Sequence, residues 1–158
     1  MTQKQTPSAI FRSMIMIHLL LCLVIALSVS ILYTLTVQSG KQLKPLDAYK
    51  ILELLLPIFG IGSFFGARFV INTRFRNIPQ ESPLTEKLEG YRVSMIMLWS
   101  ILTGTALFGA LGFSISGRQN LLLYGLMAGV FVIYFRPLRS KIAEDLNLEP
   151  HEVDLLNQ

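Results

Sequence analysis

The residues that could carry chemistry are few, and a glycine-rich stretch stands out first. Residues 59–69 read FGIGSFFGARF, with glycines at Gly60, Gly62 and Gly66. Closely spaced glycines let a backbone approach the phosphates of a dinucleotide, but that site needs a preceding strand and a soluble βαβ unit. Here the glycines lie inside an apolar run, whose backbone must satisfy its own hydrogen bonds to cross lipid. The pattern therefore favours helix packing over cofactor binding.

The same spacing of small residues recurs in two other apolar runs. Small residues at positions i and i+4 let two helix backbones approach closely within a membrane. This spacing predicts six helix-packing residues, namely Gly62, Gly66, Thr105, Gly109, Gly125 and Gly129. The sequence does not indicate which helices pair.

Glu53 is the only carboxylate inside an apolar run. Ionisable residues within membrane spans often mark ion pathways. One interpretation is therefore a proton- or cation-binding carboxylate, with Pro57 breaking the helix beside it. The other is an interfacial side chain that reaches water or pairs with Lys50, one turn earlier. The sequence leaves both open.

Familiar enzyme motifs are absent from the sequence, which contains no HExxH, no GxSxG and no P-loop. Cys22 is the only cysteine, so neither an intramolecular disulfide nor a cysteine-based zinc site can form. The acidic residues other than Glu53 fall in predicted loops or in the tail. We expect no enzymatic activity, no catalytic residue, no metal site and no cofactor.

Long apolar helices must position these residues. The 158-residue chain is 52% hydrophobic and only 15% charged, with a mean hydropathy of +0.52, which is more apolar than a soluble domain. About 20 helical residues cross a hydrocarbon layer of about 30 Å. The sequence predicts four spans, at 14–37, 51–71, 93–115 and 119–136. The fourth span is short, so the alternative for it is a re-entrant or interfacial segment. The first span is longer than the apolar core of a cleaved signal peptide.

Basic residues predict the orientation of these spans. Ten of the 14 lie at the amino end, between the second and third spans, or in the tail: Lys4, Arg12, Arg68, Arg74, Arg76, Lys87, Arg92, Arg136, Arg139 and Lys141. The positive-inside rule then places both termini in the cytoplasm. Because these residues flank apolar runs, the net charge of +4 indicates membrane orientation rather than a nucleic-acid partner.

The predicted domains are a membrane domain at 1–137 and a cytoplasmic helical tail at 138–158. In the tail, Leu138, Ile142 and Leu146 recur every four residues, which is typical of one apolar helix stripe. That stripe is expected to lie on the inner leaflet or to dock on a cytoplasmic partner.

Short matches between the two halves of the chain suggest a duplicated helical hairpin. Phe11-Arg12-Ser13-Met14 corresponds to Tyr91-Arg92-Val93-Ser94-Met95, and two further matches follow in the same order. A repeat of this kind would be parallel, with its axis along the membrane normal. It would place His18 and Trp99 at equivalent depths.

Part of the second half of the chain also carries a family resemblance. Tyr91-Arg92, Gly104-Thr105-Ala106-Leu107-Phe108, Arg136-Pro137, Lys141-Ile142 and Asp145-Leu146 resemble a group of small uncharacterised bacterial four-span membrane proteins. The resemblance implies a multi-pass protein of the bacterial inner (plasma) membrane and supplies no activity. In that group an acid and a proline lie around the glycine of the third span, and Thr103 and Thr105 stand in those places here.

These observations predict an all-α bundle of four transmembrane helices with an amphipathic tail. We expect a non-enzymatic accessory or scaffolding subunit of a membrane complex, whose partners are the lipid bilayer and other membrane subunits or further copies of itself. The alternative is a small oligomeric transporter or channel that uses Glu53.

Overall fold

The computed structural model describes residues 6–39, 48–76, 79 and 81–157, with some side chains inside these ranges left undescribed. Every regular element among them is a helix, so the all-α prediction is confirmed. The helices are α1 (Pro7–Gln38), α2 (Ala48–Arg76), α3 (Leu84–Ser116), α4 (Gln119–Tyr134), α5 (Arg139–Asp145) and α6 (Pro150–Asn157).

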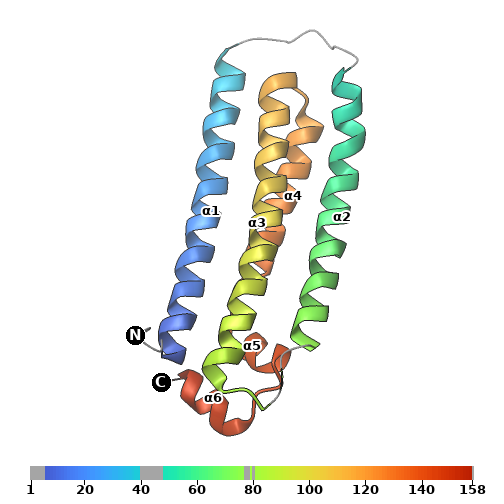
Figure 1. Cartoon of the computed structure of the whole chain (residues 1–158). Coiled ribbons are helices and arrows are strands. Elements are labelled where there is room, and N and C mark those ends of the chain that lie inside the picture. Colours follow the sequence, from blue (N-terminus) through green and yellow to red (C-terminus); the bar gives the residue numbers. More distant parts are fainter. Residues whose placement is uncertain (1–5, 40–47, 77–78, 80, 158) are drawn as a thin grey trace, which may run out of the picture.

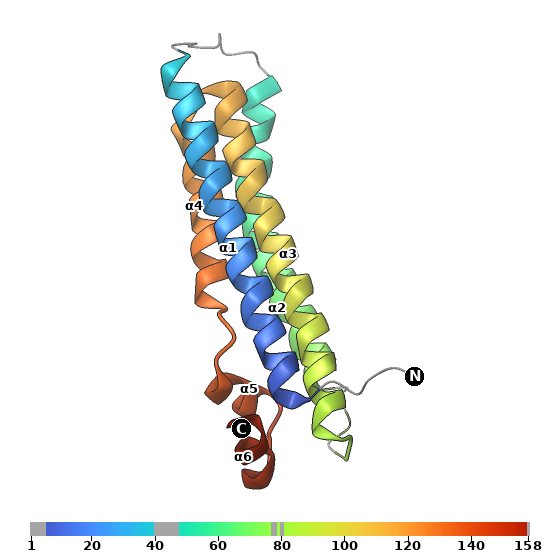
Figure 2. The same ribbon diagram turned by 90° about the vertical axis from the view of Figure 1, so that its left-hand side faces the viewer.

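The four long helices run alongside one another, and the two short ones lie at one end of the bundle (Figure 1). Helix α3 packs against α1, α2 and α4, while α1 and α2 lie on opposite flanks of the α3–α4 pair. Figure 2 shows α5 and α6 folded beneath the bundle. The start of α1 and the end of α6 therefore lie at the same end.

By length and composition, α1 and α3 are each able to cross a membrane. Helices α4 and α5 qualify together as a third span, although the chain bends by 83° between them. The apolar part of α2, Leu54–Gly66, is shorter. Two candidate spans, or three with the bent pair, are thus present among the residues described.

The observed helices extend beyond the predicted spans at the end where the tail lies. Helix α1 begins at Pro7 rather than at residue 14, and α3 begins at Leu84 rather than at residue 93. Thr6 caps α1 by accepting a hydrogen bond from the backbone N–H of Ala9 at 3.4 Å. These additional polar turns give the tail a surface to pack against.

A tight turn joins α3 to α4. Gly117 has a φ of 68°, a left-handed conformation that glycine adopts without steric cost, and its N–H donates to the carbonyl of Phe113 at 2.7 Å. The two helices therefore run antiparallel as a hairpin.

Helices α3 and α4 approach to backbone contact through Gly109 and Gly125. A Cβ at Gly109 would lie 2.6 Å from the Cα of Gly125 and 2.8 Å from the carbonyl oxygen of Leu121. A Cβ at Gly125 would lie 2.8 Å from the carbonyl oxygen of Ala106. Because backbone atoms cannot move aside as side chains do, only glycine fits at either position.

The tail packs on the bundle as a cap. Ile142, Leu146 and Leu156 are 0%, 3% and 0% exposed and belong to the same apolar core as Ile10 and Met14 of α1. The expectation that the stripe of the tail is free for the inner leaflet or a partner is therefore wrong for Ile142 and Leu146. The bend after α4 turns them back onto the chain, and only Leu138, at 40% exposed, stays outside.

Substituting the contact glycines tests the α3–α4 hairpin. Gly109→Ala and Gly125→Ala should each destabilise the protein by about 1–3 kcal/mol, because an added methyl group forces the backbones apart. Gly104→Ala is the matched control on α3, since its Cβ would meet no atom within 4 Å. Thermal unfolding in detergent, followed by circular dichroism, provides the measurement. Equal melting temperatures for all three variants would contradict the contact.

Candidate functional site

Gly62 and Gly66 lie on the side of α2 that points away from the rest of the chain. A Cβ at either position would meet no atom within 4 Å. Their exposed neighbours are Ile58 and Phe69, at 59% and 73% exposure. We call these four residues the glycine face of α2. The described residues of this chain do not cover it.

The opposite side of α2 makes the contacts with the bundle. The Ser63 hydroxyl lies 3.3 Å from that of Thr105 on α3, and the Phe64 ring packs 4.6 Å from that of Phe131 on α4. Leu56 is fully buried on this side. Thr105 is thus placed at an α2–α3 contact.

The remaining predicted residues fall in different places. Gly129 faces α1, where an added Cβ would lie 3.4 Å from Cγ2 of Ile25. Glu53 lies in α2, but its side chain is outside the part of the chain that the structure describes. Ion binding at Glu53 therefore stays a prediction.

His18 and Trp99 meet at the end of α4. Trp99 Nε1 donates to the carbonyl of Phe135 at 2.9 Å, and His18 Nε2 lies 2.9 Å from the carbonyl oxygen of Val132. Because that carbonyl can only accept, Nε2 carries the hydrogen. The last carbonyl groups of a helix have no hydrogen-bond donor within that helix. Here the buried side chains of Trp99 and His18 serve as the donors. Their rings contact edge to face at 5.1 Å.

A buried ion pair joins α3 to the tail. Lys87 Nζ donates to Glu152 Oε1 at 2.8 Å, with only 5% and 9% of the two side chains exposed. The second oxygen of Glu152 accepts the backbone N–H of Glu149 at 3.0 Å. Burial raises the pKa of Glu152, but these two hydrogen bonds and the charges of Lys87 and His151 together outweigh burial and hold the pKa below its ordinary value.

A second polar contact joins α3 to the tail nearby. The Tyr91 hydroxyl donates to Asp145 Oδ2 at 3.1 Å. Burial raises the pKa of Asp145, while the hydrogen bond from Tyr91 and the charge of Lys141 act in the opposite direction. Sequence reasoning missed both contacts because their members are 65 and 54 residues apart.

Beside Asp145 lies a polar pocket of about 240 Å³, enclosed by α2, α3, α4 and α5. We call it the polar pocket. It is lined by Arg68, Asn72, Tyr91, Met95, Leu98, Tyr134, Phe135, Lys141, Glu144 and Asp145. Two basic and two acidic side chains thus meet within one cavity.

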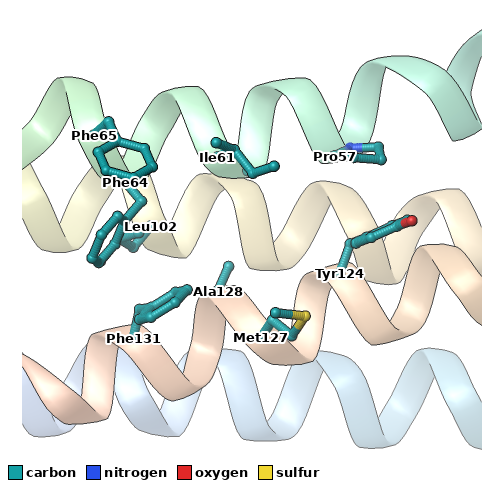
Figure 3. Close-up of a pocket in the computed structure, with 10 residues that line it drawn as sticks. Pro57, Ile61, Phe64, Phe65, Leu102, Tyr124, Met127, Ala128 and Phe131 are labelled. Atoms are coloured by element: carbon teal, nitrogen blue, oxygen red, sulfur yellow. The ribbon is translucent and has the colours of Figure 1, made fainter.

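An apolar groove of about 330 Å³ runs along the bundle between α2, α3 and α4 (Figure 3). Its lining consists of Pro57, Gly60, Ile61, Phe64, Phe65, Leu102, Tyr124, Met127, Ala128 and Phe131. Figure 3 shows Pro57 and Tyr124 at one end of the groove and Phe64 and Phe131 at the other. We call it the apolar groove.

The groups that line the polar pocket are suited to binding a polar molecule. Within the described ranges, no three His, Cys, Asp or Glu side chains are grouped so as to hold a metal ion. The polar pocket offers charged groups of both signs and tyrosine hydroxyls, which bind and orient polar molecules.

The Lys87–Glu152 pair is testable by a double-mutant cycle. Lys87→Met should release the tail at a cost of about 3–5 kcal/mol, because Glu152 stays buried without its cation. The double variant Lys87→Met/Glu152→Met should recover most of this loss, since neither charge remains. The rate of tryptic cleavage at Arg139 and Lys141 in the tail measures the release. Equal cleavage of the single and double variants would rule out a coupled pair.

The same pair should make tail attachment sensitive to acid. Because the pKa of Glu152 is depressed in the folded state, its contribution to stability is present above its ordinary pKa of 4.5 and is lost as pH falls through the depressed value. The protection factors of the tail amides in hydrogen exchange should therefore fall as the pH drops below about 4.5. The double variant Lys87→Met/Glu152→Met is the control and should show no such pH-dependent change. Asp145, whose raised pKa affects stability with the opposite sign, is present in both proteins and cannot account for a difference between them.

Comparison with known proteins gave no match to any family model, to any curated protein or to any solved structure. The resemblance to small bacterial four-span membrane proteins is neither supported nor refuted by this result.

Proposed function

We propose that this chain is a multi-pass protein of the bacterial inner membrane that crosses it four times, with both termini in the cytoplasm. We further propose that it serves as a non-enzymatic accessory or scaffolding subunit of a membrane complex. The uncovered glycine face of α2 is the observation that carries this function.

The dimensions of the bundle support four spans. Helix α2 has 29 residues, which is about 44 Å of helix, and it lies alongside the two candidate spans α1 and α3. Helix α4 has 16 residues, or about 24 Å. Arg118 and Arg136 flank it and can extend towards the lipid headgroups, so that a locally thinned bilayer accommodates it.

The positions of the chain ends and of the charges support the proposed orientation. An even number of spans returns the chain to its starting side, and α1 begins at the end of the bundle where α6 ends. Arg68 of α2 and Arg92 of α3 lie towards that end, and Lys141 lies in the tail itself. The positive-inside rule assigns such an end to the cytoplasm.

The subunit role rests on a comparison within the chain. Small residues four apart bring α3 and α4 into backbone contact at Gly109 and Gly125. The same spacing on α2, at Gly62 and Gly66, meets no neighbour among the residues that the structure describes. Two glycines inside a membrane helix lower its helix propensity and remove side-chain surface that could pack. Close approach of another helix would offset this loss of stability. We assign that helix to another subunit.

Blocking the glycine face tests this role. The variant Gly62→Leu/Gly66→Leu should lose a membrane partner that copurifies with the native chain in mild detergent, because two large side chains prevent close approach. Gly62→Ala/Gly66→Ala is the matched control and should keep the partner, since alanine is still small. Mass spectrometry of the purified material identifies the partner, or a second copy of the chain. Recovery of the native protein only as a monomer would overturn the proposal.

A further inference from the structure

The apolar groove and the polar pocket lie next to each other along the bundle. On α2, the groove ends at Phe65 and the pocket begins at Arg68. On α4, the groove ends at Phe131 and the pocket begins at Tyr134. Each step is three residues, which is about one helical turn.

Helix α3 lines both spaces as well. It contributes Leu102 to the groove and Leu98 to the pocket, four residues apart. The Phe64 ring lies between the two spaces, since it is 4.6 Å from the Phe131 ring and 6.0 Å from the Phe135 ring. The lining therefore changes from apolar to polar on α2 and α4 at this level, and on α3 at Tyr91.

The basic groups of the pocket are suited to a phosphate. Lys141 Nζ lies 5.1 Å from the centre of the Tyr134 ring and 5.0 Å from that of Phe135, and these rings orient the ammonium group. Arg68 lines the pocket from α2, and its positive charge acts on Asp145 across the cavity. A guanidinium and an ammonium group together are a common phosphate-binding arrangement.

The acidic groups of the pocket favour a ligand that also carries a positive charge. Asp145 and Glu144 line the same cavity as Arg68 and Lys141. The Tyr91 hydroxyl donates to Oδ2 of Asp145 at 3.1 Å. A purely anionic headgroup would meet repulsion from both carboxylates, whereas a headgroup with a phosphate and an ammonium group would find a partner for each charge.

We propose that one phospholipid with a phosphoethanolamine headgroup binds here, with an acyl chain in the apolar groove and its headgroup in the polar pocket. Arg68 and Lys141 bind the phosphate, and Asp145 and Glu144 bind the ammonium group. The inference depends on the membrane location proposed above but not on the subunit role, because it concerns the isolated chain.

Native mass spectrometry of the purified chain in detergent tests the headgroup assignment. Phosphatidylethanolamine should bind roughly tenfold more tightly than phosphatidylglycerol, which has the phosphate but no ammonium group. Asp145→Asn should abolish this preference, since the amide keeps the shape and the Tyr91 contact but loses the charge. Arg68→Gln should weaken binding of both lipids. Equal binding of the two lipids by the native chain would overturn the assignment.

The groove has its own test. Gly60 lines the groove, and a Cβ there meets no atom within 4 Å, so Gly60→Leu fills the space without a backbone clash. This variant should lower the affinity for phosphatidylethanolamine by roughly tenfold. Gly104→Leu is the matched control, since Gly104 is equally open but lines a different groove. An unchanged affinity of Gly60→Leu, or binding of free phosphoethanolamine as tight as that of the lipid, would overturn the proposal.

Discussion

The backbone contact between α3 and α4 at Gly109 and Gly125 determines how the rest of the bundle is built. Because the two helices are in backbone contact there, no other helix can enter between them at this level. Helices α1 and α2 therefore pack on opposite flanks of the pair, and α2 contacts the bundle along one side only. The glycine face and the apolar groove are both consequences of this arrangement.

The polar chemistry gathers at one end for a related reason. A buried charge is costly unless it is paired and hydrogen-bonded, so the long apolar segments offer few places for one. The extra turns of α1 and α3 are covered by α5 and α6, and together they form a region that is both buried and polar. The pair of Lys87 with Glu152 and the contact of Tyr91 with Asp145 attach the tail there. The polar pocket forms where this cap meets the ends of the long helices.

The sequence predicts where the helices lie along the chain better than how they pack against one another. Apolar runs indicate the all-α class, and small residues point to Gly109 and Gly125. Apolar residues lie on both the buried and the exposed side of α2, as Leu56 and Phe69 show, so hydrophobic periodicity cannot show that Gly62 and Gly66 face outward. The approach of His18 to Val132, 114 residues away, has no local signal, because it depends on how three helices pack. The capping role of the tail likewise depends on a bend whose direction no periodicity encodes.

Cross-linking in native membranes tests the central claim, that another helix covers the glycine face of α2. Cys22 is the only native cysteine, so a Cys22→Ala background gives a chain with one reactive thiol at a chosen site. In that background, Gly62→Cys labelled with benzophenone-4-maleimide should, on irradiation, give an adduct of defined mass larger than the monomer. Val130→Cys, on the exposed side of α4 at 62% exposure, should stay monomeric. A monomer from Gly62→Cys, or equal adducts from both positions, would contradict the account.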